Sequence, residues 1–184
     1  WHIQRDILLN NDKYSMLEVA LSTFFLNRTN RSGILKAGVI GGKEQKGKWK
    51  LDARFNKQDV IKRIKLIGTY KDKIHVSNLD AVDFLLVQKR TLPKKSLIYL
   101  DPPYYVKGAE LYRNFYLHDD HVKIANTLRN ITLPWIVSYD NVNEIREIYQ
   151  DLNMADYSLN YTAQDKKKGL EVIIYNDGVK IPEI

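Results

Sequence analysis

Apolar residues recur at helical spacing in two stretches of the first 70 residues. Residues 14–27 read YSMLEVALSTFFLN, and their apolar positions are Met16, Leu17, Ala20, Leu21, Phe24 and Phe25. This spacing predicts a largely buried helix. Residues 56–70 resume the same period and reach Gly68, which suits a C-terminal helix cap.

Beyond residue 70, short apolar runs alternate with helical patterns. Strands are expected at 74–77, 97–100 and 134–139, helices at 80–88, 119–130 and 141–150, and two last strands near 155–161 and 170–175. The last two strands, joined by the lysine-rich segment 164–169, could form a hairpin. Short strands that alternate with helices indicate an α/β fold with a parallel sheet covered on two faces.

Residues 28–50 are rich in glycine and basic side chains, which predicts surface loops and a short hairpin. Their glycine cluster, KAGVIGGKEQKG, follows no convincing strand and opens no helix. It therefore fails the structural test for a nucleotide-binding loop.

Charge narrows the choice of partner. The chain has 184 residues, 44% of them hydrophobic, with a formal net charge of +7. This size suits one domain, or a domain with a small insertion, that can bury a core. The positive charge favours an anionic partner, nucleic acid first and an acidic membrane surface second, although good solubility would explain it equally well.

The absence of cysteine excludes disulfides and cysteine-bound zinc, and no apolar run is long enough to predict a membrane span.

Polar residues follow three of the predicted strands. Asn78–Asp80, Asp101 and Asp140–Asn141 stand directly after apolar runs. In open α/β sheets, ligands gather at the carboxyl ends of the strands. These three tips are therefore expected to face one crevice.

The run LIYLDPPYY, residues 97–105, carries the most specific chemistry. An ionised carboxylate only accepts hydrogen bonds, and proline has a carbonyl but no N–H, so Asp101-Pro102-Pro103 forms a rigid bend that displays acceptors. Two acceptors beside the flat ring of Tyr104 match a planar ring that bears an exocyclic amine. The alternative is a simple turn that stops the strand. A buried strand that ends in Asp-Pro-Pro-Tyr is a more specific pattern than a Pro-Pro dipeptide alone, so it favours the functional interpretation.

This motif resembles the catalytic motif of amino-group methyltransferases that use S-adenosylmethionine. Residues 24–57 are similar to the recognition region of the bacterial and phage DNA adenine-N6 methyltransferase family, in the branch that places the cofactor motif first, then recognition, then catalysis. The resemblance continues through NLDAVDFL, PWIVSYDN and KKKGLEVIIYN. It implies a partial Rossmann-like class I methyltransferase sheet with an inserted helical and hairpin DNA-recognition region.

By motif position, the resemblance implies a role for each residue of the catalytic motif. Asp101, Pro102, Pro103 and Tyr104 would hold the N6 amine of a flipped-out adenine, with Tyr104 stacking on the base. Flipping fits the chemistry, because the amine cannot be approached inside a stacked duplex. Asn78, Asp80 and Asp101 would bind the cofactor. Tyr112, Phe115 and Tyr116, in a segment that could form a lid, would either contact the base or simply pack.

No metal is expected. His118 and His121 stand beside Asp119 and Asp120, which superficially resembles metal ligation, but an acidic helix N-terminus explains these residues more simply. Methyl transfer from a sulfonium also needs no metal.

The DNA contacts are expected in residues 1–70, and residues 71–184 would form the catalytic part. The expected DNA-binding residues are Asn27, Arg28, Asn30, Arg31, Ser32, Gly33, Lys43, Lys46, Lys48, Arg54 and Lys57. Lysine and arginine neutralise phosphates, whereas Arg28, Asn30 and Arg31 could address base edges. The alternative is a solvated basic loop without a partner.

One feature of the family is missing. Neither a Phe-x-Gly-x-Gly-like turn nor the ribose-binding acid of the following strand occurs in the sequence. We therefore expect the chain to be a C-terminal fragment that lacks the first strands and much of the cofactor pocket. Whether this fragment binds the cofactor or is active stays open.

Two other functions stay open: an amino-group methyltransferase that acts on RNA or protein, and a DNA-binding remnant without enzymatic activity.

The resemblance implies double-stranded DNA as the partner, no membrane, and a cytoplasmic location in a bacterial or phage-infected cell. A companion restriction endonuclease is a candidate partner. The sequence leaves open the DNA site and the oligomeric state.

Overall fold

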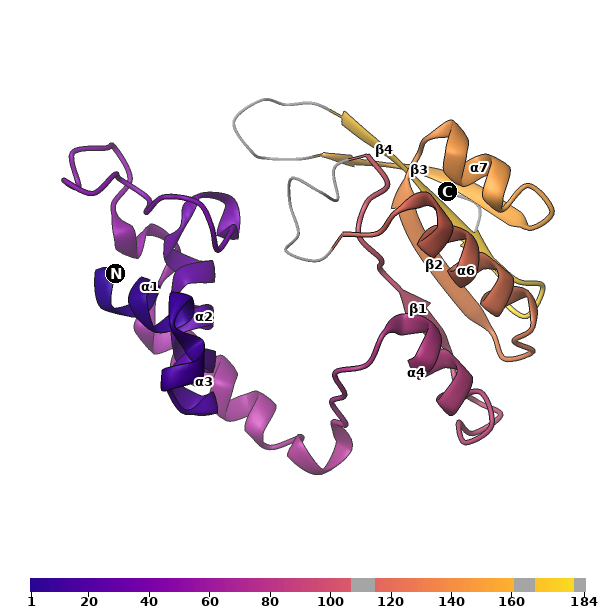
Figure 1. Cartoon of the computed structure of the whole chain (residues 1–184), viewed down its shortest axis with the longest axis horizontal. Coiled ribbons are helices and arrows are strands. Elements are labelled where there is room, and N and C mark those ends of the chain that lie inside the picture. The colour runs from indigo at the N-terminus through magenta and orange to yellow at the C-terminus, as the bar shows by residue number, and fades with distance from the viewer. Residues whose placement is uncertain (107–114, 161–167, 181–184) are drawn as a thin grey trace. The chain divides into compact units, whose positions relative to one another are not determined.

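A computed structural model describes residues 1–106, 115–160 and 168–180 (Figure 1). The chain forms two compact units, residues 1–76 and 77–184. This division falls six residues beyond the boundary expected at residue 70. Each unit has its own helices, and only the second contains the sheet. No helix in the described residues is both long enough and apolar enough to cross a membrane.

The first unit is built on helices α1 (His2–Leu9), α2 (Met16–Thr29) and α3 (Lys57–Gly68). The start of α2 is encoded locally, because Ser15 and Glu18 form a reciprocal capping box. The expected helix at 14–27 is confirmed, but its expected burial is wrong. Only Ser22, Leu26 and Thr29 are buried, whereas Met16 is 88% exposed.

Helix α3 confirms the expected helix at 56–70. It begins where the Asn56 side chain accepts a hydrogen bond from the Asp59 N–H, at 3.1 Å. Gly68 is the last helical residue and does not form the cap itself, which is Thr69.

The hairpin expected within residues 28–50 is not formed. A single antiparallel bridge joins Asn30 to Val39, and turns follow. Gln45 organises them, because its amide donates to the Ile40 carbonyl at 2.7 Å and accepts from the Leu51 N–H at 2.8 Å. The glycine cluster opens no helix; a 3-10 turn at Leu51–Arg54 comes next.

The second unit contains a four-stranded sheet of order β1-β2-β4-β3. The strands are β1 (Ile98–Leu100), β2 (Trp135–Asp140), β3 (Asn153–Asn160) and β4 (Lys168–Tyr175). β1 and β2 are parallel, as expected, and β3 and β4 form the expected antiparallel hairpin. The prediction of a parallel sheet is wrong for the rest, because β4 lies between β2 and β3 and is antiparallel to both.

The strand expected at 74–77 is also absent. Residues 74–80 form an extended connection without strand pairing, in which Val76 is 90% exposed. An apolar run becomes a strand only when another strand takes up its backbone hydrogen bonds, and none of the described strands lies beside this one.

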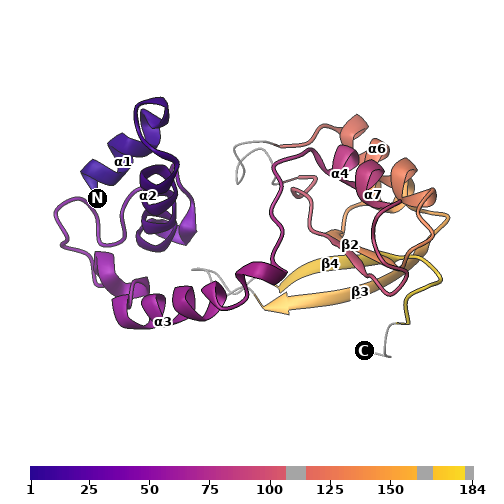
Figure 2. The same ribbon diagram turned by 90° about the horizontal axis from the view of Figure 1, so that it is seen from below.

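Helices α4 (Ala81–Gln88), α6 (His118–Arg129) and α7 (Asn143–Ile148) lie on one side of the sheet (Figure 2). Alternate strand residues point into this layer, so Val137, Tyr139, Val172 and Ile174 are fully buried. The sequence predicts helices on both faces of the sheet, but the helices in the described residues cover one face. The unit is thus a mixed α/β layer structure.

Candidate active site

A pocket of about 710 Å³ lies at the carboxyl end of β1. Asn78 and Asp80 line it from the connection that leads into α4, and Asp101, Pro102 and Pro103 line it from the segment after β1. Apolar side chains of α4 and β1 complete the wall: Phe84, Leu85, Ile98 and Leu100. The structure therefore brings together all three residues expected to bind the cofactor and three of the four expected to act in catalysis.

Asp101 follows β1 directly and is exposed to the pocket. Its Oδ1 accepts a hydrogen bond from Ser138 Oγ at 3.2 Å. Ser138 lies on the neighbouring strand β2, is 3% exposed, and also contacts the Tyr99 hydroxyl at 2.9 Å. The position of the Asp101 carboxylate is thus fixed from β2, while its remaining lone pairs face the pocket.

Asp140, at the end of β2, holds the segment that follows Asp101. One of its oxygens accepts the N–H of Tyr105 at 2.8 Å and the other accepts the N–H of Val106 at 3.1 Å. The polar tips of β1 and β2 are therefore joined. Asp140 and Asn141 do not line the pocket, so two of the three tips expected to face one crevice do so. The anchoring roles of Ser138 and Asp140 were not predicted from the sequence, although the place of Asp140 directly after an apolar strand was noted.

Tyr104 is anchored by a residue of β4. Its hydroxyl donates to Glu171 Oε1 at 2.8 Å, and the Tyr157 hydroxyl donates to Oε2 of the same carboxylate. Glu171 lies in β4 and is only 4% exposed. Sequence reasoning missed Glu171; the available signal was a single acid inside the apolar run LEVIIY.

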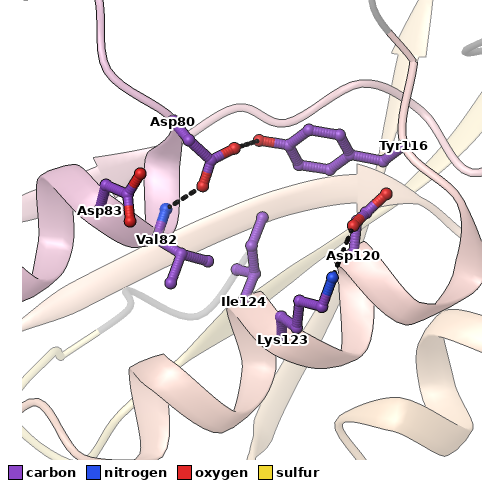
Figure 3. A pocket seen from close by; sticks show the side chains of 7 residues that line it. All are labelled: Asp80, Val82, Asp83, Tyr116, Asp120, Lys123 and Ile124. Carbon is purple, nitrogen blue, oxygen red and sulfur yellow. Dashed lines mark hydrogen bonds and ion pairs between the residues drawn. The ribbon is translucent and has the colours of Figure 1, made fainter.

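Asp80 has two structural contacts at the mouth of a neighbouring cavity of about 340 Å³ (Figure 3). Oδ1 accepts the N–H of Val82 at 2.9 Å and so caps α4, and Oδ2 accepts the Tyr116 hydroxyl at 3.4 Å. Burial and, after it, the Asp80 charge raise the pKa of Tyr116. Tyr116 lines both cavities, whereas Phe115 is 49% exposed and Tyr112 lies outside the described residues.

The two histidines of α6 contact tyrosines. His118 Nδ1 lies 3.0 Å from the Tyr105 hydroxyl, and the buried His121 Nδ1 lies 3.1 Å from the Tyr139 hydroxyl. Burial lowers the pKa of His121. Asp120 accepts the Leu117 N–H at 3.1 Å, as an acid at a helix N-terminus should. Within the described ranges, no three potential ligand side chains gather as a metal site would require.

Most of the expected DNA-binding residues are accessible in the first unit. The exposed ones are Asn27, Arg31, Ser32, Lys43, Lys46, Lys48, Arg54 and Lys57, while Arg28 and Gly33 are half-buried. Arg28 and Arg54 line a cavity of about 460 Å³ together with Asp52 and Asp59.

Asn30 differs from the others, because its side chain is fully buried. Its oxygen accepts the Trp1 indole N–H at 2.6 Å, and its amide donates to the carbonyls of Ile34 and Leu35, each at 3.1 Å. The base contact expected of Asn30 is therefore not available in this structure. Asn30 instead organises the loop that carries the basic residues.

Two glycines of the first unit, Gly38 and Gly33, lie close to arginine side chains. A Cβ on Gly38 would come within 2.8 Å of the Arg31 guanidinium. A Cβ on Gly33 would first meet Asn27, at 3.2 Å, and would lie at an ordinary contact distance of 3.6 Å from Arg54. Gly33 also has a φ of +75°, which other residues rarely adopt. A side chain at residue 38 would therefore have to displace the far end of Arg31, whereas Gly33 is favoured by its backbone conformation.

An α/β unit with an Asp-Pro-Pro pocket at a strand end, joined to a basic helical unit, has the parts of a methyltransferase that acts on an amine of a nucleic acid. The family model of the D12 class N6 adenine-specific DNA methyltransferases matches residues 4–163. The chain therefore belongs to this family of enzymes, which methylate adenine in DNA. The match spans most of both units and confirms the family predicted from the sequence. No curated protein matches the chain.

Proposed function

We propose that the protein moves a methyl group from S-adenosylmethionine to N6 of an adenine flipped out of double-stranded DNA. The observation that carries this proposal is the pocket in which Asn78, Asp80, Asp101, Pro102 and Pro103 meet. The family accounts for adenine in DNA as the substrate; the methyl donor, the flipping step and the residue roles are argued from the pocket.

The residues of this pocket fit the proposed cofactor. Its volume of about 710 Å³ lies in the range of ligand sites. The apolar wall of Phe84, Leu85 and Leu100 suits a purine ring, and the carboxylate of Asp80 can accept from amine or hydroxyl groups. When bound, S-adenosylmethionine would supply an electrophilic methyl group on a positively charged sulfur.

Asp101 and Pro102 would prepare the amine for transfer. The Asp101 carboxylate would accept one N–H of the amine and the Pro102 carbonyl the other, which draws the nitrogen out of conjugation and frees its lone pair. Because Ser138 already occupies Oδ1, the carboxylate is oriented before substrate arrives, and orientation of this kind lowers the barrier. The negative charge of Asp101 would also stabilise the positive charge that develops on nitrogen.

The first unit would supply the contacts to DNA. Its exposed lysines and arginines can neutralise backbone phosphates without reading the sequence. The roles of Asn27, Arg28, Arg31, Ser32, Gly33, Arg54 and Lys57 remain part of this proposal. A cytoplasmic location in a bacterial or phage-infected cell, and a companion restriction endonuclease as a candidate partner, belong to it as well.

The experiment is methyl transfer from labelled S-adenosylmethionine to unmethylated DNA, followed by nucleoside analysis. It compares the 184-residue chain, the product of the complete reading frame, and Asp101→Ala and Asp83→Ala variants of that product. Asp83 is an exposed acid of the neighbouring cavity and serves as the matched control. We expect N6-methyladenine from the complete product and from Asp83→Ala, and none from Asp101→Ala.

Other outcomes distinguish the alternatives. Methyl incorporation only into RNA or protein would indicate a different amine substrate. DNA binding without any binding of S-adenosylmethionine would indicate a remnant that has lost its enzymatic activity. Activity of the complete product but not of the 184-residue chain would support the expectation that the chain is a fragment.

A further inference from the structure

Two carboxylates stand directly opposite each other in the sheet. Asp140 of β2 pairs with Glu171 of β4 in the antiparallel register. Like charges in this arrangement repel each other, and a buried carboxylate is costly unless hydrogen bonds compensate it. Glu171 is 4% exposed. Because this pair of carboxylates is unfavourable for the stability of the sheet, we expect contacts of the two side chains with residues outside the strands to account for it.

Both carboxylates bind the same short segment, which follows the Asp-Pro-Pro bend. Asp140 accepts the N–H groups of Tyr105 and Val106, and Glu171 accepts the hydroxyl of Tyr104 at 2.8 Å. Three consecutive residues are therefore held by two acids from neighbouring strands. Asp140 fixes the main chain of the segment, whereas Glu171 reaches the far end of an aromatic side chain.

Glu171 is itself fixed in place. Tyr157 of β3 stands opposite it in the register and donates its hydroxyl to Oε2. The Glu171 carboxylate that accepts the Tyr104 hydroxyl therefore has little freedom to move. Hydrogen bonds to a charged acceptor are also about twice as strong as neutral ones.

We propose that Glu171 is a positioning residue that fixes the plane of the Tyr104 ring, so that this ring forms a rigid stacking platform for the target base. The inference rests on the proposed function, in which Tyr104 stacks on the flipped adenine. A tyrosine ring turns about two side-chain torsions, and a hydrogen bond at its hydroxyl removes much of this freedom. When the ring is already fixed before the base binds, stacking loses less conformational entropy.

A double-mutant cycle tests whether Glu171 acts through Tyr104. The variants are Glu171→Gln, Tyr104→Phe and the two combined, made in the complete reading-frame product and compared by single-turnover methyl transfer. Glutamine keeps the size of the side chain and removes its charge, and phenylalanine keeps the ring and removes the hydroxyl. We expect each single variant to slow transfer about tenfold, a typical size for losing a bond to a charged group, and the combination to be no slower than the slower single variant.

Additive losses would overturn the proposal, because they would mean that Glu171 acts on the sheet independently of Tyr104. Tyr104→Phe changes the loop rather than the sheet, so it tests the bond even if Glu171→Gln does not fold. DNA affinity should stay within about twofold in each variant, since the bond orders the base platform and not the phosphate contacts.

A second readout does not depend on activity. In protein labelled with 3-fluorotyrosine, the fluorine resonance of Tyr104 is identified by its loss in Tyr104→Phe. We expect Glu171→Gln to shift this resonance and to leave that of Tyr14, in the other unit, unchanged. An unmoved Tyr104 resonance would overturn the proposal. A shift in a protein that makes no methyladenine would refute the proposed function and still support the anchoring of Tyr104.

Discussion

Tyr105 and Asp140, 35 residues apart in the chain, are joined by a hydrogen bond of 2.8 Å from the Tyr105 N–H to the Asp140 carboxylate. The parallel pairing of β1 and β2 makes this contact, because both strands end at the same edge of the sheet. The second carboxylate oxygen takes the next N–H, from Val106. The geometry of the candidate catalytic segment is therefore set by a residue on a different strand.

Asp140→Ala should damage both stability and activity. Two N–H groups would lose a charged acceptor, so we expect the free energy of unfolding to fall by about 2 kcal/mol and methyl transfer to fall at least tenfold. Denaturant unfolding and single-turnover transfer measure the two effects. Glu144→Ala, an exposed acid of α7, is the control; equal behaviour of the two variants would contradict the anchoring role.

Ser138→Ala should slow methyl transfer while leaving the fold intact. The substitution removes the hydroxyl that donates to Asp101 Oδ1, and losing a hydrogen bond to a charged group corresponds to a rate loss of about tenfold. The rate should fall at saturating substrate, because Ser138 orients the carboxylate and does not line the pocket. Ser158→Ala, at an exposed position of β3, should retain the wild-type rate.

Replacing Lys43, Lys46 and Lys48 together by glutamine should weaken DNA binding and make it less dependent on salt. All three are exposed. If each contacts a phosphate, the slope of log affinity against log salt should decrease in magnitude by about 3. Fluorescence anisotropy at several salt concentrations measures the slope. A double replacement of Lys94 and Lys95, exposed residues of the other unit, is the control, and an unchanged slope in the triple variant would argue against phosphate contact.

Asn30→Ala should destabilise the first unit. The substitution leaves the Trp1 indole and two backbone carbonyls without their partner, and unsatisfied buried groups cost about 1–3 kcal/mol. Thermal unfolding of the chain reports the loss. Asn27→Ala is the comparison, because Asn27 is exposed and makes one such bond, to the Gly33 carbonyl. A stable Asn30→Ala protein with weakened DNA binding would instead support the base contact that the sequence predicts for Asn30.

His121 should make the second unit less stable in acid. Burial lowers the pKa of His121 in the folded protein below its ordinary value of 6.5. As pH falls below about 6.5, the unfolded chain takes up a proton that the folded protein does not, so stability is present above this pH and declines below it. The contribution of one such group is at most about 1.4 kcal/mol per pH unit. Denaturant unfolding between pH 7.5 and pH 5.5 (about one unit either side of the ordinary pKa) should give a flatter profile for His121→Gln, and an unchanged profile would exclude this origin.

Several features of the chain were predictable because neighbouring residues alone determine them. The capping box of Ser15 and Glu18 starts α2 wherever that helix packs, and the acids that open residues 119–130 indicated the start of α6. The Asp-Pro-Pro-Tyr run after an apolar strand indicated the family, and the family model supports that identification. Local periodicity and short motifs depend on residues within one or two turns, so a single sequence carries them.

Other features depend on which distant segments meet, and only the tertiary structure decided them. Periodicity could not place β4 between β2 and β3, since pairing is a choice among strands of similar composition. Asn30 looks like a base-reading residue in the sequence, yet the Trp1 indole and two loop carbonyls bind its side chain after folding. Glu171 binds Tyr104 across 67 residues. A polar side chain can contact substrate or organise the fold, and the partners that it finds after folding decide between these roles.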